Sequence, residues 1–152
     1  MISFFKIQSC FLAYIKTAEN KKMQYNSIED MFKSYRRHKV FSRFSDKDLL
    51  SFVNSLTFEK DGKINLIFDN KWDAHIYRTG LMNDMFIWKH ISNFNVYTLI
   101  VRAEYSDVFL RKTSKYVLSK NRSIIVKDIM GSDHLFPINN YTKTLDLIKE
   151  HC

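Results

Sequence analysis

Two short apolar runs in the last third of the chain constrain its fold more than any other feature. The first is Val96–Val101, and the second is Ser123–Val126, which continues toward Ile129. Continuous β-branched and apolar runs are typical of strands covered on both faces, as in parallel sheets. Helix-like apolar spacing separates the runs and also follows the second, with Tyr141, Leu145 and Ile148 at i, i+4 and i+7. The order strand, helix, strand, helix predicts an α/β fold with parallel strands and a right-handed crossover.

The rest of the chain is mainly helical by pattern. Residues 1–18 have apolar side chains at helical spacing, and the polar residues 19–26 are predicted to form a linker. Ser27 with Asp30 and Ser45 with Asp48 match the Ser-x-x-acid capping box, so each pair is predicted to open a helix. Two helices therefore occupy much of the segment between residues 27 and 56.

A turn and a strand follow these helices. Asp61-Gly62 predicts the turn, and residues 63–68 alternate at first like a short strand. Residues 69–83 have no clear period, and Asn83 is predicted to cap a helix that ends near Ile91.

Composition excludes several classes of protein. The chain has 152 residues, of which 45% are hydrophobic and 26% charged, as in a folded globular protein. Its three glycines stand alone at Gly62, Gly80 and Gly131. The sequence therefore contains no G-x-S-x-G nucleophile elbow and no Gly-rich phosphate loop.

The formal net charge is +8, which makes polyanions potential partners. The basic residues are scattered, and the densest group lies between Lys33 and Arg43. A small basic nucleic-acid-binding protein is kept as the alternative function, although nucleic acid is the less favoured partner. A steep salt dependence of binding would distinguish this alternative.

Two cysteines, Cys10 and Cys152, have no zinc-type spacing, and free thiols suggest a cytoplasmic location. The apolar N-terminal stretch is interrupted by Lys6 and Gln8 and is too short for a membrane span. No cofactor is expected.

Asp107 and His134 form the candidate catalytic pair. Asp107 follows the first buried run and His134 follows the second. The loops that leave two neighbouring parallel strands emerge at the same edge of a sheet, where α/β proteins place their sites. A carboxylate that orients an imidazole supplies two members of an acyl-transfer triad. An oxygen-rich metal site that adds Glu104 and Asp133 is disfavoured, because no metal-ligand spacing supports it. Ser132 is disfavoured as a nucleophile, because it lacks an elbow and would need its own oxyanion hole.

Three segments resemble α/β-hydrolase-fold enzymes. Phe94–Asp107 is similar to their I-x-C-P-T-L-L-L-R-G-E-x-S-D segment, and Met130–Pro137 is similar to their G-x-G-H-x-x-P loop. Tyr35–Leu66 resembles their lid region. The resemblance covers residues 25–152 and implies that Asp107 is the triad acid and His134 the triad base. Ala103, Tyr97 and Asp133 differ from the family pattern, which has Gly, Pro and Gly there.

The resemblance implies the carboxyl-terminal half of an ester-type hydrolase, a partial α/β-hydrolase fold. Residues 1–24 are then an apolar helix and linker, 25–92 a helical lid-like region, and 93–152 a β-α-β-α part of the core. The nucleophile-bearing half is not represented in the sequence. We expect a chain that is inactive alone or part of a split hydrolase, with a separate amino-terminal half or a second copy as partner. A small-molecule substrate would bind only to the completed enzyme.

Overall fold

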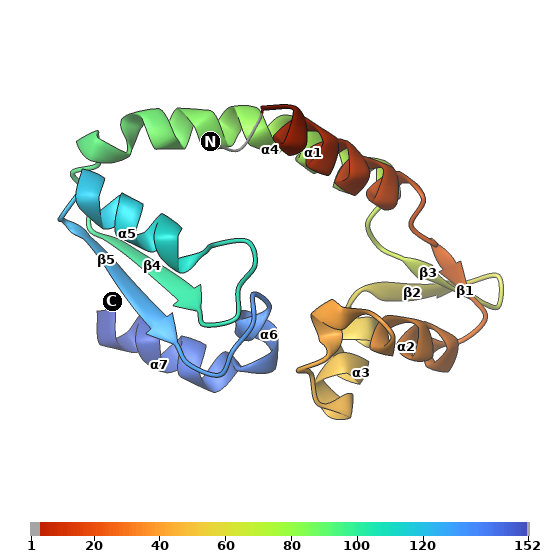
Figure 1. Ribbon diagram of the computed structural model, residues 1–152. Helices are drawn as coiled ribbons and strands as arrows, with labels where there is room; N and C mark the ends of the chain where they lie inside the picture. Colours follow the sequence, from red (N-terminus) through yellow and green to blue (C-terminus); the bar gives the residue numbers. More distant parts are fainter. Residues whose placement is uncertain (1–3, 152) are drawn as a thin grey trace. The chain divides into compact units, whose positions relative to one another are not determined.

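The computed structural model describes residues 4–151, apart from the side chains of residues 4–11 and 81–83 (Figure 1). The chain divides into two compact units. The first comprises Met1–Ser34 and Ser51–Trp88, and the second comprises Tyr35–Leu50 and Lys89–Cys152.

The first half of the chain contains four of the α-helices and a small sheet. The helices are α1 (Phe4–Glu19), α2 (Ile28–Arg36), α3 (Asp46–Ser55) and α4 (Asn70–His90), and a short 3-10 helix, η1, covers Lys39–Phe41. The strands are β1 (Gln24–Tyr25), β2 (Thr57–Lys60) and β3 (Lys63–Leu66).

Both serines cap the helices that they were predicted to open. The Ser27 hydroxyl accepts the backbone N–H of Asp30 (3.1 Å) at the start of α2. The Ser45 hydroxyl accepts the N–H of Asp48 (3.0 Å) and donates to its carboxylate (2.6 Å) at the start of α3. These bonds satisfy backbone donors that the first turn of a helix leaves without a partner.

The predicted Asp61-Gly62 turn and the strand after it are also confirmed. Asp61 and Gly62 have φ of 53° and 67°, the left-handed values that a tight two-residue hairpin turn requires. Two further strands were not predicted: β2 pairs antiparallel with one edge of β3, and β1 pairs antiparallel with the other. Residues 19–26 are therefore not a plain linker, since they include β1 and the buried ring of Tyr25.

The prediction for residues 69–91 is wrong about where the helix begins. A single helix, α4, runs from Asn70, so Asn83 lies within it and does not cap it. Asp69 provides the cap, because its carboxylate accepts the N–H of Lys71 (2.8 Å). The α1 and α4 helices lie side by side in the first unit: Tyr14 and Tyr77 stack with ring centroids 5.7 Å apart.

The second unit contains the predicted β-α-β-α order. After the 3-10 helix η2 (Ile91–Asn93), its elements are β4 (Thr98–Ala103), α5 (Arg111–Lys120), β5 (Ile124–Ile129), α6 (Phe136–Asn139) and α7 (Tyr141–His151). Strands β4 and β5 are parallel. Their register pairs Thr98 with Ile124 at one end and Ala103 with Ile129 at the other. The predicted parallel pair is confirmed.

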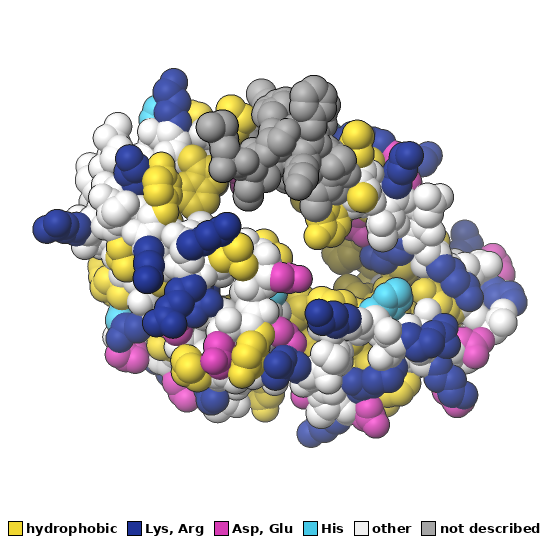
Figure 2. Space-filling view, in the orientation of Figure 1, with side chains coloured by type: hydrophobic (Ala, Val, Ile, Leu, Met, Phe, Trp, Pro, Cys, Tyr) yellow, Lys and Arg dark blue, Asp and Glu magenta, His cyan; other side chains and the backbone are white. Residues whose placement is uncertain are grey.

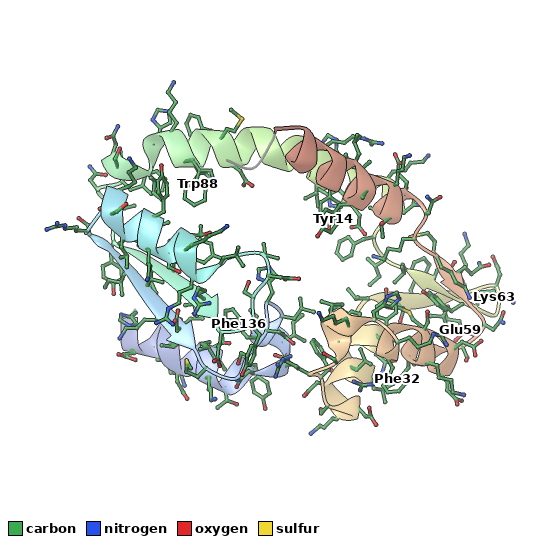
Figure 3. All side chains as sticks on the ribbon, viewed as in Figure 1. Tyr14, Phe32, Glu59, Lys63, Trp88 and Phe136 are labelled. Atoms are coloured by element: carbon green, nitrogen blue, oxygen red, sulfur yellow. The ribbon has the colours of Figure 1, made fainter. Side chains whose placement is uncertain are left out.

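Helices cover both faces of this strand pair, as the apolar runs predict. Val117 of α5 packs with Ile124 of β5 on one face. On the other face Phe136, labelled in Figure 3, packs with Ala103 and Ile129. The alternation of strand side chains explains why these two clusters separate.

Candidate active site

The loops that follow β4 and β5 are joined by backbone hydrogen bonds beyond the ends of the strands. The N–H of Glu104 donates to the carbonyl of Ile129 (3.0 Å), and the N–H of Tyr105 donates to the carbonyl of Ser132 (2.9 Å). The Glu104 carboxylate accepts the N–H of Gly131 (2.8 Å). Gly131 has a φ of 74°, a conformation that glycine adopts without strain. The two loops therefore meet at one edge of the sheet, as the strand order predicts.

A buried arginine supports this edge from within the sheet. Arg102 of β4 is 5% exposed and faces Asp128 of β5 across the ladder. Its guanidinium donates two bonds to the Asp128 carboxylate, from Nε (2.8 Å) and Nη2 (2.7 Å). Its Nη1 donates to the carbonyls of Ala103 (3.1 Å) and Glu104 (3.3 Å), where the loop begins.

This ion pair changes the acidity of both partners. The hydrogen bond from Arg102 lowers the pKa of Asp128 below its ordinary value of 3.8, with a smaller contribution from the charge of Arg111. The same hydrogen bond raises the pKa of Arg102. The sequence does not predict this pair, because pairing across the ladder depends on a register that the sequence does not display.

His134 is exposed, and the partner of its Nδ1 is Ser106. The distance from Ser106 Oγ to His134 Nδ1 is 3.4 Å, and Ser106 is 7% exposed. Asp107, the next residue, is exposed, and within residues 4–151 no hydrogen bond or ion pair is found for its carboxylate. The loops thus place Ser106, the residue before Asp107, in contact with His134. A hydrogen bond between Asp107 and His134 stays a prediction.

Ser106 was missed as a site residue, although it stands directly before the predicted triad acid. Its hydroxyl also accepts the N–H groups of Val108 (3.3 Å) and Phe109 (3.0 Å). Serine in a loop often accepts hydrogen bonds from backbone N–H groups two or three residues later, so these bonds of Ser106 could have been predicted from the sequence.

Asp133 and Ser132, the two residues before His134, form hydrogen bonds with residues other than His134. The Asp133 carboxylate accepts the N–H of Leu135 (3.0 Å) and the side-chain amide of Asn139 (3.3 Å), so it serves the turn into α6. Ser132 is 4% exposed, and its hydroxyl accepts a bond from Asn140 (2.9 Å). The Ser132 hydroxyl is therefore buried and hydrogen-bonded to Asn140.

The described residues offer little support for other kinds of site. Within them, no group of three or more His, Cys, Asp and Glu side chains is arranged to hold a metal ion. None of the helices in this part of the chain is long and apolar enough to cross a membrane. Lys and Arg side chains are exposed on both units among acidic and apolar ones (Figure 2).

Comparison with known proteins identifies the fold. No protein-family model matches the sequence. No curated protein matches it either. Among solved structures, E-2-(acetamidomethylene)succinate hydrolase superposes with a TM-score of 0.79 and 16% identity, over 95% of this chain and 52% of that one. The peroxisomal α/β-hydrolase Lpx1 of Saccharomyces cerevisiae superposes with a TM-score of 0.72 and 10% identity, over 95% of this chain and 38% of that one.

A third solved structure agrees with these two. An esterase from M. tuberculosis gives a TM-score of 0.70 at 12% identity, over 98% of this chain and 51% of that one. The chain thus spans about half the length of these solved structures, or less. Identities this low establish the fold and leave the activity open. The chain has a partial α/β-hydrolase fold.

Proposed function

We propose that this chain supplies the acid and base of an ester-type hydrolase to a nucleophile that lies outside its 152 residues. His134 is the general base and Asp107 is the carboxylate that orients it. The observation that carries the proposal is the joined pair of loops at the carboxyl edge of β4 and β5. The Ser106–His134 contact brings the residue before Asp107 to the imidazole.

The chemistry requires both residues and a third group. His134 would take a proton from the attacking hydroxyl and return it to the leaving group, and Asp107 would stabilise the imidazolium between these steps. The sequence has no G-x-S-x-G elbow, and Ser132 is buried and hydrogen-bonded. Ser106, the serine in contact with His134, is also buried, and its hydroxyl accepts two backbone N–H groups. We therefore place the group that the base would activate outside this chain.

The missing group would come from the part of the fold that this chain does not span. The solved hydrolases that it resembles are about twice as long or longer. That remainder is where the resemblance implies a nucleophile elbow and an oxyanion hole. We propose that the substrate is an ester or a related acyl compound, and that it binds only when both parts are present.

Complementation tests this function. The purified chain is mixed with the amino-terminal part of a serine α/β-hydrolase that carries the elbow, and hydrolysis of a p-nitrophenyl ester is followed. We expect no turnover and no serine-phosphonate labelling from either part alone, and both from the mixture. Loss of a triad histidine leaves only the weak catalysis that binding and an oxyanion hole provide.

The variants make the result specific. His134→Ala should abolish the activity of the mixture, and Asp107→Asn should reduce it strongly. His75→Ala is the matched control, because His75 is an exposed histidine of α4 and should leave the activity unchanged. Strong serine-probe labelling of the isolated chain, or full activity of a His134→Ala mixture, would refute the proposal.

A further inference from the structure

We infer that the Ser106 hydroxyl holds His134 in the Nε2–H tautomer and competes with Asp107 for Nδ1. The inference rests on the proposed function, because it concerns how the proposed base is prepared for catalysis. It makes Ser106 a positioning residue that keeps His134 in a resting state until Asp107 takes its place.

The hydrogen-bond capacity of Ser106 carries the argument. A serine hydroxyl has two acceptor lone pairs and one donor hydrogen. The N–H groups of Val108 (3.3 Å) and Phe109 (3.0 Å) point at Oγ and occupy both lone pairs. Only the O–H hydrogen is left for the contact with His134 Nδ1 at 3.4 Å.

The direction of that bond fixes the proton on the imidazole. If Ser106 donates, Nδ1 must be the unprotonated nitrogen, and the proton of the neutral ring is on Nε2. The opposite arrangement would place a third donor on an oxygen with two lone pairs. Burial of Ser106 to 7% exposure limits the access of water that could replace either bond.

This tautomer is the wrong one for a triad base. In a triad, Nδ1–H donates to the carboxylate and the free Nε2 accepts the proton of the nucleophile. His134 with a proton on Nε2 cannot accept one there. Catalysis therefore requires the proton to leave Nε2 for solvent and another to bind Nδ1, with Nδ1 transferred from Ser106 to the Asp107 carboxylate.

Asp107 is available for this exchange. It is one residue from Ser106 in the same loop, it is exposed, and its carboxylate has no hydrogen bond to the rest of the described chain. Asp133, the other nearby carboxylate, is occupied by Leu135 and Asn139. The competition for Nδ1 is therefore between adjacent residues of one loop.

Nitrogen-15 NMR of the full chain tests the inference directly. Long-range proton–nitrogen correlations distinguish the two tautomers of a neutral imidazole, and the His134→Gln variant assigns the signal among the five histidines. The measurement is made at about pH 8.5, above the ordinary histidine range. We expect the Nε2–H form to dominate in the wild type.

Three variants test the competition. Ser106→Ala should raise the ratio of Nδ1–H to Nε2–H between about two- and ten-fold, the effect of one neutral hydrogen bond. Ser106→Thr keeps the hydroxyl and should keep the wild-type ratio. Asp107→Asn should leave the wild-type ratio unchanged and should make the rise smaller when combined with Ser106→Ala.

Either of two results would overturn the inference. One is a dominant Nδ1–H form in the wild type, which is independent of how the variants fold. The other is an unchanged ratio in a Ser106→Ala chain whose amide spectrum stays native. The measurement uses neither nucleophile nor substrate, so failed complementation would refute the proposed function and leave this result standing.

Discussion

Removal of the Asp128 carboxylate should destabilise the second unit, because it leaves a buried guanidinium without its counter-ion. Arg102 is 5% exposed, whereas the Asp128 side chain is 36% exposed. Loss of one partner from a fully buried pair costs about 3–5 kcal/mol, and exposed pairs contribute about 0.2–1 kcal/mol. The pair is buried at one end only, and Nη1 keeps its bonds to Ala103 and Glu104. We therefore expect Asp128→Ala to lower the free energy of unfolding by about 2 kcal/mol.

Urea unfolding of the chain, followed by far-UV circular dichroism, measures this change. With a urea m-value of about 2 kcal/mol/M, the midpoint should fall by about 1 M while the slope stays the same. Lys127→Gln is the matched control on the same strand, because Lys127 is 42% exposed and lies 3.8 Å from Glu150. The control should change stability by less than about 0.5 kcal/mol. An Asp128→Ala midpoint equal to that of the control would refute the reasoning.

The same pair should produce a defined pH dependence. Since the hydrogen bond from Arg102 lowers the pKa of Asp128, its contribution is complete above the ordinary pKa of 3.8. The contribution is lost as the pH falls through the lower pKa of the folded state. The stability difference between wild type and Asp128→Asn should therefore be constant near neutral pH and narrow below about pH 4. A difference that widens in acid would contradict this sign.

Two further predictions concern local structure. Asn121→Ala should lower the unfolding free energy by about 2–3 kcal/mol, because the buried amide bonds the carbonyls of Ile91 (3.0 Å) and Phe94 (2.8 Å) and the N–H of Ser123. Thermal unfolding would measure the loss, and an unchanged transition would contradict it. Gly62→Ala should cost about 1 kcal/mol through strain alone, since φ is 67° and nothing lies within 4 Å of an added Cβ. Urea unfolding measures this cost, and a neutral result would exclude a left-handed conformation at this residue.

Local signals predicted much of the fold. The two capping boxes depend on residues three apart, and the parallel strands depend on apolar runs and on the helix between them. The Asp61-Gly62 turn was predicted, but the strand before it was not. A two-residue turn with both φ values positive nearly always joins two strands, so β2 could have been predicted from β3.

Helix α4 shows where periodicity fails. Its large apolar side chains from Trp72 to Trp88 are exposed on several sides, so they form no single stripe with a helical period. Gly80 lies within the helix and weakens the helical signal further. With no clear stripe, periodicity does not locate the start of the helix, and the cap at Asp69 is the local signal that does.

The candidate site was predicted at the level of loops, and its contacts were not. Strand order alone brings the loops after β4 and β5 to one edge. The partner of His134 depends on how Ser106 divides its hydroxyl between two amides and an imidazole, and this division follows from the loop conformation. The resemblance to hydrolases implies a role for Asp107 and gives no information about the hydrogen bonds of the adjacent serine.

The register of β4 against β5 connects the stability of the second unit to the geometry of the site. A slip of one residue would move each strand side chain to the opposite face and would separate Arg102 from Asp128. The same guanidinium holds the carbonyl of Glu104, whose N–H and carboxylate bind the loop after β5. These bonds fix the place at which the chain reaches Ser106, two residues later. We therefore expect this ion pair, buried at its Arg102 end, to favour the observed register more than it adds to stability, and the loop that carries Ser106 begins at the carbonyl that Arg102 binds.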